Sequence, residues 1–328
     1  MRRRTWILGA LAFAAVSAAA RSIAQQPRVK LPRVALLTSP PLPNPLVEAF
    51  RQGMRELGYV EGESVELDLR SAEGRPERFP ALAADIVKRR PDVIVSGGGT
   101  PSARAAMRAT SSIPIVFPAS GDPVAEGLVQ SLARPGRNVT GFSIVAPEIS
   151  GKRVELIKEL LTRVKLIAVL QDPVLRAGYD QIGATEAAAR ELGIQILTLS
   201  PAKPEEYESN YAIAKKSGAD ALIVLPSSSF NANRRQLIGL SEKHKLPTVW
   251  EHREFARSGG LVSYGPDISS LYRASARYVD KILKGANPAD LPVERASKFE
   301  LVINLKGARA VGIGVPQSLV LRADQVLQ

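Results

Sequence analysis

The chain has 328 residues, of which 45% are hydrophobic and 23% charged, so it can form two globular domains with sizeable cores. Its formal net charge is +12, but basic pairs such as Lys152-Arg153 are scattered along predicted helices. That distribution is typical of a solvated surface and not of a nucleic-acid-binding patch. Aromatic residues make up 5% and cysteine is absent, which disfavours a base-stacking platform and excludes disulfides and a lipid-modified N-terminal cysteine.

Residues 1–24 have the pattern of an export signal. The basic start MRRRTW precedes the apolar run ILGALAFAAVSAAA, and SIA before Gln25 has the small residues of a cleavage site. An apolar run of about 14 residues is too short to span a bilayer. We therefore predict cleavage near Ala24 and a periplasmic protein with no direct membrane anchor. The segment RRTWI (3–7) resembles the twin-arginine export pattern, and a general-secretory signal is the alternative.

Short apolar strands alternate with amphipathic helices through the rest of the chain. Near-continuous apolar strands separated by helices are typical of parallel sheets that helices cover on both faces. The strands fall into two sets. The first set is RVALLTS (33–39), SVELDLR (64–70), DVIVSGG (92–98) and IPIVFPA (113–119), and the second is KLIAVLQ (165–171), IQILTLS (194–200), DALIVLP (220–226) and LPTVWE (246–251).

The two sets follow the same plan, which predicts an α/β fold with two doubly wound parallel-sheet lobes joined by a multi-strand hinge. The segment NVTGFSIVAP (138–147) connects the sets, and GGLVSYGPD (259–267) ends the second. In such sheets ligands bind beyond the carboxyl ends of the strands, so facing strand ends would form a cleft. The predicted domains are an N-terminal lobe of residues 31–143 plus about 266–292 and a C-terminal lobe of residues 144–265 plus about 296–328.

The segment VIVSGGGTPSARAA (93–106) places three glycines between a predicted strand and a predicted helix. Gly98 and Gly99 would leave backbone N–H groups uncovered, and Thr100 before Pro101 has the pattern of an N-cap and a first helical residue. The helix N-terminus would suit a carboxylate or another electron-rich group. A capped turn without a ligand is the alternative. The glycine spacing is not G-x-G-x-x-G and no P-loop lysine follows, so a nucleotide phosphate is not favoured.

Polar residues recur at the other predicted strand ends. For each of them individually, capping of the next helix is the alternative explanation. Together they could hold a zwitterion, with a helix N-terminus meeting its carboxylate and an Asp or Glu meeting its ammonium group. The predicted ligand-binding residues are Ser39, Gly98, Gly99, Thr100, Ser120, Asp122, Asp172, Ser227, Glu251 and Tyr264.

Four aromatic residues lie near the predicted strand ends. Packing in the core or hinge is the commoner role for such residues, and two of them facing the cleft would favour an aromatic or apolar solute. The four are Phe117, Phe230, Trp250 and Tyr264.

The sequence does not favour catalysis. It contains no G-x-S-x-G nucleophile elbow, and the available histidines are His244, at a predicted helix end, and His252, after Glu251. With no cysteine and two histidines a zinc site is not expected, and no calcium-binding loop occurs. We predict neither an enzyme nor a cofactor.

Three stretches of the chain resemble the exported solute-binding proteins of ABC transporters. The resemblance covers the chain from about residue 31 to its end and implies a type I periplasmic-binding-protein fold. The segment TSPPLPNP departs from the family pattern on one side of the implied site. The stretches that carry the resemblance are SGGGTPSARAAMRATSSIPIVFPASGDPVAEGLVQSLARPGRNVTGFS, REFARSGGLVSYGPD and YVDKILKGANPADLPVERASKFELVINLKGARAVGIGVPQSLVLRADQVL.

The resemblance implies that a monomer captures a small solute, an amino acid or similar polar metabolite, and delivers it to the membrane permease of an ABC importer. Family contacts with the solute come from the loop of Gly99 and Thr100, from the SGDP loop (120–123) and from strand ends of the second lobe. Two alternatives stay open: an exported α/β enzyme acting on a small metabolite, and a ligand-sensing subunit of a membrane receptor.

Overall fold

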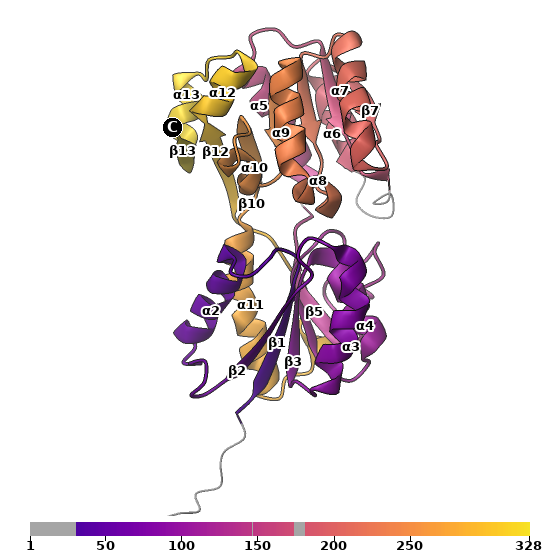
Figure 1. The fold of residues 1–328 in the computed structure, drawn as a ribbon, viewed down its shortest axis with the longest axis vertical. Helices are drawn as coiled ribbons and strands as arrows, with labels where there is room; N and C mark the ends of the chain where they lie inside the picture. The colour runs from indigo at the N-terminus through magenta and orange to yellow at the C-terminus, as the bar shows by residue number, and fades with distance from the viewer. Residues whose placement is uncertain (1–30, 146, 174–180) are drawn as a thin grey trace, which may run out of the picture.

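The computed structural model describes residues 31–145, 147–173 and 181–328, and it contains two β-sheets with helices packed on each (Figure 1). The eight predicted strands are confirmed, with bounds that shift by a few residues. The predicted export signal lies outside the described residues. Within those residues, no helix combines the length and apolar character needed to cross a membrane.

The first sheet is entirely parallel, with strand order β11-β5-β4-β3-β1-β2. Helices α2 and α11 cover one of its faces, and α3 and α4 cover the other (Figure 1). We call this sheet with its helices the first lobe. Its elements are β1 (Arg33–Thr38), α2 (Pro45–Glu56), β2 (Glu66–Ser71), α3 (Phe79–Lys88), β3 (Val93–Gly97), α4 (Gly99–Ala109), β4 (Ile115–Ser120), β5 (Val139–Ser143), α11 (Ile268–Leu283) and β11 (Glu294–Arg295), with 3₁₀ turns η1 (Pro76–Arg78) and η4 (Pro288–Asp290).

Strand β1 illustrates why the strands read as continuous apolar runs. Val34 and Leu36 pack with Phe50 of α2 on one face. Ala35 and Leu37 belong to the core cluster on the other face, beneath α3 and α4. Because side chains of a strand alternate between faces, a sheet covered on both sides needs apolar residues at every position.

The second sheet has strand order β13-β12-β10-β9-β8-β6-β7 and is parallel except for the antiparallel pair β10 and β12. We call this sheet with its helices the second lobe, which has its own two core clusters. Its elements are α5 (Pro147–Leu160), β6 (Leu166–Leu170), α6 (Gln181–Glu191), β7 (Gln195–Leu199), α7 (Tyr207–Lys216), β8 (Ala221–Val224), α8 (Ser228–Ala232), α9 (Arg234–His244), β9 (Thr248–Trp250), α10 (Arg253–Arg257), β10 (Val262–Pro266), β12 (Phe299–Asn304), α12 (Leu305–Val311), α13 (Gln317–Arg322) and β13 (Gln325–Leu327), with the 3₁₀ turn η3 (Pro204–Glu206).

The connections between the lobes make the carboxyl edges of the two sheets face each other. Strand β5 of the first sheet ends at Ser143, and the next element, α5, belongs to the second lobe. Strand β10 of the second sheet ends at Pro266, and the next helix, α11, packs against α2 of the first lobe. A third connection joins β11 to β12. Because their parallel neighbours end on the same side, both rows of strand ends point toward the other lobe (Figure 1).

Candidate functional site

The glycine loop after β3 differs from its prediction in one respect: Thr100 is not the N-cap. Helix α4 begins at Gly99, whose φ of +69° favours glycine, and Gly98 holds the N-cap position. A Cβ on Gly98 would lie 2.3 Å from the ring of Phe79, so a bare Cα is needed there as well. The Ser102 hydroxyl accepts a hydrogen bond from the Gly98 N–H (2.9 Å) and donates one to the Gly99 carbonyl (2.9 Å). With these bonds the helix begins before Thr100, so the Thr100 hydroxyl does not cap the helix and can bond another partner.

That partner is Glu126, a residue that sequence reasoning did not select. The Thr100 hydroxyl donates to Oε2 of Glu126, and the buried Ser120 hydroxyl at the end of β4 donates to the same oxygen at 3.2 Å. The two hydroxyl oxygens lie 3.3 Å apart. Burial raises the pKa of the Glu126 carboxyl, and the two hydroxyl donors partly oppose that rise. We call Thr100, Ser120 and Glu126 the first-lobe cluster.

Two other predicted site residues of the first lobe, Asp122 and Ser39, have other bonds. Asp122 Oδ1 accepts the backbone N–H groups of Val124 (3.1 Å) and Ala125 (3.0 Å), so it caps a turn and not a helix. Ser39 follows β1, and its carbonyl accepts a hydrogen bond from Gly74 at 2.7 Å. A turn cap therefore accounts for one oxygen of Asp122, whereas the alternative interpretation expected a helix cap.

In the second lobe the structure brings Asp172, Ser227 and Glu251 together from the ends of β6, β8 and β9. The Ser227 hydroxyl donates to Asp172 Oδ2 at 2.6 Å and also caps α8 by accepting two backbone N–H groups. A backbone hydrogen bond from Ser227 stabilises the ionised form of Glu251. We call these residues, with Arg153 and Tyr264, the second-lobe cluster.

Arg153 supplies the positive charge of this cluster. It extends from α5 and is only 2% exposed, and its Nε donates to the backbone carbonyl of Tyr264 at 3.0 Å. Its charge favours the ionised form of Glu251. The interpretation of Lys152-Arg153 as a solvated surface pair is therefore wrong for Arg153. Ile149 and Ile157, four residues to either side, are buried, so helical periodicity alone places Arg153 on the buried face of α5.

Two adjacent residues at the end of β9 have shifted pKa values of opposite sign. Burial raises the pKa of Glu251 to about 7, although Arg153 and the Ser227 backbone act against the shift. Burial lowers the pKa of His252 to about 4. The His252 Nδ1 accepts the Glu254 N–H and so caps α10, which is a structural role. Both residues prefer the uncharged form because the surrounding protein replaces water.

Three of the four aromatic candidates belong to the core. Phe117 and Trp250 are fully buried and Phe230 is 1% exposed, so they pack inside the lobes and do not stack on a ligand at the surface. Tyr264 is partly exposed and stacks on Phe299, with ring centroids 6.4 Å apart. One partly exposed aromatic pair therefore lies where β10 and β12 approach the first lobe.

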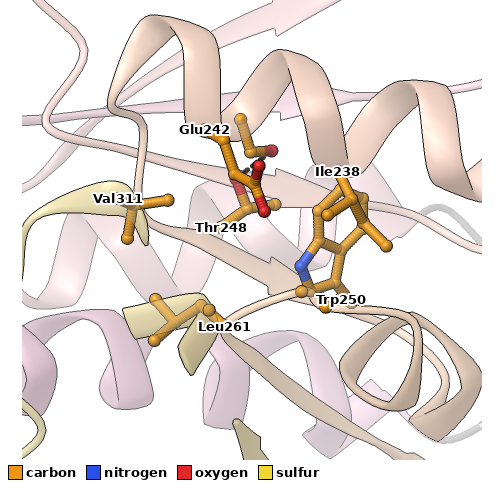
Figure 2. Close-up of a pocket in the computed structure, with 10 residues that line it drawn as sticks. Ile238, Glu242, Thr248, Trp250, Leu261 and Val311 are labelled. Carbon is orange, nitrogen blue, oxygen red and sulfur yellow. Dashed lines mark hydrogen bonds between the residues drawn. The ribbon is translucent and has the colours of Figure 1, made fainter. Parts of the chain in front are cut away.

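A small hollow lies elsewhere in the second lobe, among α9, β9 and α12 (Figure 2). It is lined by Thr248, the first residue of β9, and by Leu261, which directly precedes β10. These positions lie at the amino ends of the strands, so this hollow is distinct from the facing carboxyl edges. Among residues 31–145, 147–173 and 181–328, no group of His, Asp and Glu is arranged to hold a metal ion.

The site geometry and the connections define a class of protein. Two α/β lobes, linked by crossings after β5, β10 and β11, place polar clusters on facing strand edges, and this is the architecture of type I periplasmic binding proteins. Residues 34–327 match the family described as ABC transporter substrate binding protein. The chain belongs to that family, and it is a solute-binding protein of the ABC transporter class. Proteins of this family are extracytoplasmic.

Three proteins are similar to this chain over most of its length. The chain is 26% identical over 258 residues, 78% of its length and 73% of the relative's, to a tyrosine-binding protein of Clostridioides difficile (strain R20291). A crystal structure of the ABC domain in complex with L-Trp from Streptococcus pneumonia has 29% identity and a TM-score of 0.82, covering 91% of this chain and all of that one. A conserved domain protein from Vibrio cholerae has 33% identity and a TM-score of 0.80, covering 90% of this chain and all of that one.

Proposed function

We propose that this protein binds an amino acid between the first-lobe and second-lobe clusters and delivers it to the permease of an ABC importer. The observation that carries the proposal is the position of the two clusters. Their hydroxyls, carboxylates and one arginine come from strands and helices far apart in sequence, and they all lie at the two edges that face each other. A structural role alone does not require polar groups to gather at both edges.

The chemistry of the clusters suits an amino acid. A zwitterion has an ammonium group that needs acceptors and a carboxylate that needs donors. Carboxylates of Glu126 and Asp172 provide acceptors, while Arg153 and the N-terminus of α4 provide positive charge. Two relatives are described as binding tyrosine or as crystallised with L-Trp, which supports the same class of solute.

Capture of the solute would involve closure of the two lobes, here residues 31–143 with about 266–292 and residues 144–265 with about 296–328. A solute that contacts both lobes only when they close favours the closed form by its differential affinity. A permease can then distinguish a loaded monomer from an empty one by the spacing of the lobe surfaces. Export with cleavage near Ala24 would place the protein where it meets its solute.

A binding screen tests the proposal. The chain from residue 25 onward is mixed with amino acids, nucleosides, sugars and small carboxylates, and its thermal unfolding is recorded. A solute at about 100 times its dissociation constant adds about 2.7 kcal/mol to the free energy of unfolding. We expect an amino acid to give this shift, and recovered solute to be chemically unchanged. Stabilisation by a sugar or nucleoside alone contradicts the amino-acid assignment, and a converted solute contradicts binding without catalysis.

Closure is tested by small-angle X-ray scattering of the same chain with and without the solute found in the screen. We expect a smaller radius of gyration in the loaded protein. Arg253 of α10 bonds Glu300 of β12 at 3.0 Å and also Ser269 of α11, so it links the second lobe to the first beside two of the crossings. Arg253→Met removes this link and is expected to change the radius of the empty protein. A radius that does not respond to solute contradicts the closure.

A further inference from the structure

The hydroxyls of Thr100 and Ser120 together form a place where a carboxylate oxygen binds. Thr100 is the second residue of α4 and Ser120 ends β4, and both hydroxyls donate to Oε2 of Glu126. A serine or threonine hydroxyl has one O–H donor, so neither can donate to a solute while Glu126 stays in place. Because this strand end faces the other lobe, the same two donors suit the carboxylate of an amino acid.

The backbone of Glu126 is fixed independently of its side chain. Its N–H donates to the Asp122 carbonyl at 2.8 Å, and its carbonyl accepts a hydrogen bond from Arg104 at 2.9 Å. The Glu126 side chain is partly exposed, and Ala125 and Gly127 on either side of it are exposed. The carboxylate can therefore leave the two hydroxyls by rotation of its side chain toward solvent, while the turn keeps its hydrogen bonds.

The position that the Glu126 carboxylate occupies is stabilised only in part. Burial raises the pKa of this carboxyl, and the effect of burial exceeds that of the two hydroxyl donors. Rotation toward solvent restores hydration of the carboxylate and keeps it near the exposed Arg104, whose charge already acts on it. The free-energy difference between the two positions is thus a difference between opposed contributions, which a competing carboxylate can reverse.

We propose that Thr100 and Ser120 bind the carboxylate of the solute, and that Glu126 is an internal competitor that occupies their place in the empty protein and is displaced on binding. This inference rests on the proposed function, since it concerns the same site. Once displaced, the Glu126 carboxylate remains available as an acceptor for the ammonium group. The competition lowers the apparent affinity in proportion to the fraction of empty protein whose two hydroxyls are free.

The test is calorimetric titration of the chain from residue 25 onward with three sets of compounds. The first set is leucine, tyrosine and tryptophan. The second is their deaminated acids, isocaproate, hydroxyphenylpropionate and indolepropionate, which keep the carboxylate and lack the ammonium group. The third is their decarboxylated amines, isoamylamine, tyramine and tryptamine. The acids isolate the competition for the hydroxyls from any contact of Glu126 with an ammonium group.

Three variants separate displacement from simple charge repulsion. Glu126→Ala frees both hydroxyls, whereas Glu126→Gln removes the charge and leaves an amide oxygen that can still accept from them. The double variant Thr100→Val with Glu126→Ala removes one of the freed hydroxyls. Glu63→Ala is the matched control, because it removes an exposed carboxylate near the amino end of β2. Thermal unfolding without solute verifies that each variant is folded.

We expect Glu126→Ala to bind the deaminated acids about tenfold more tightly than the wild type, as when about a tenth of the empty protein has free hydroxyls. Glu126→Gln is expected to gain less, and Glu63→Ala nothing. The gain is expected to vanish in the double variant, because one donor is lost. It is also expected to be absent for the amines, because they have no carboxylate.

Equal gains by Glu126→Gln and Glu126→Ala that persist in the double variant would mean that Glu126 only repels anions, and this overturns the inference. Unchanged, weaker or undetectable binding of the acids by Glu126→Ala also overturns it. In both cases, binding of an intact amino acid to the wild-type protein leaves the proposed function standing. Failure of every compound to bind any of the proteins overturns both.

Discussion

The two facing edges have the same architecture, but different groups stabilise the buried acidic residue on each. On the first edge Glu126 is balanced by two hydroxyl donors and a nearby exposed arginine. On the second edge a buried arginine, Arg153, lies within the cluster beside Glu251, whose pKa is raised to about 7. The second edge therefore depends on an internal ion that folding must dehydrate, whereas the first depends on neutral donors. The difference indicates that stability and solute recognition are coupled more strongly in the second lobe.

The largest effect is expected where the internal ion is removed. Arg153→Met keeps much of the apolar stem but leaves the Tyr264 carbonyl and Glu251 without their cationic partner. We expect the free energy of unfolding to fall by about 3 to 5 kcal/mol, measured by urea denaturation. The control is Arg322→Met, which breaks an exposed pair with Glu159 (2.7 Å) and should cost less than about 1 kcal/mol. Equal losses from the two variants would contradict a special role for Arg153.

The second-largest effect is expected from adding a methyl group to a tightly packed glycine, and each edge has one such glycine. A Cβ on Gly265 would lie 1.8 Å from the backbone carbonyl oxygen of Glu251, while one on Gly98 would lie 2.3 Å from a side chain, the ring of Phe79. We expect Gly265→Ala to lower the free energy of unfolding by about 2 to 3 kcal/mol and Gly98→Ala to lower it by less. Gly239→Ala is the control: it lies in α9 with open space around it and should stabilise the protein by about 0.5 to 1 kcal/mol. A larger loss at Gly98 would reverse the comparison.

The pH dependence separates Glu251 from its neighbour His252. The folded protein holds the Glu251 proton more tightly than the unfolded chain, because the pKa rises from 4.5 to about 7. The resulting stabilisation is full below about pH 4.5 and is lost as the pH rises through about 7. His252, whose pKa is lowered to about 4, has the opposite sign: its contribution is present above its ordinary pKa of 6.5 and is lost as the pH falls toward 4.

Glu251→Gln removes one of these opposed contributions. The free energy of unfolding of the variant minus that of the wild type is expected to be about 2 kcal/mol larger at pH 8 than at pH 5.5. The comparison with wild type at each pH cancels the contribution of His252. Parallel stability curves for the two proteins would show that Glu251 does not titrate in this range.

The smallest effect concerns the neutral donors of the first edge. Thr100→Val preserves side-chain shape but withdraws one of the two hydroxyls from Glu126, and Ser120 remains. We expect a loss of about 1 kcal/mol in thermal or urea unfolding, since one hydrogen bond to Glu126 is lost while the other remains, and no helix cap is affected. A loss close to that of Arg153→Met would mean that the first edge also depends strongly on one residue.

The sequence by itself determined the α/β class, the eight strands and which residues follow strand ends. Apolar runs such as RVALLT and the intervening helical patterns carry that information locally. The positions of Thr100, Ser120, Asp172, Ser227 and Glu251 after strand ends were predicted in the same way, because parallel strands end on a common edge.

Only the tertiary structure decided how those residues are bonded. Thr100 is not the helix cap because Ser102, two residues later, bonds Gly98 and Gly99. Glu126 joins Thr100 and Ser120 because a turn held by Asp122 brings its carboxylate back to the strand edge. Arg153 meets Tyr264 across 111 residues of sequence. Which donor satisfies which acceptor depends on distances between segments far apart in the chain, and local patterns of hydrophobicity and capping contain no such distances.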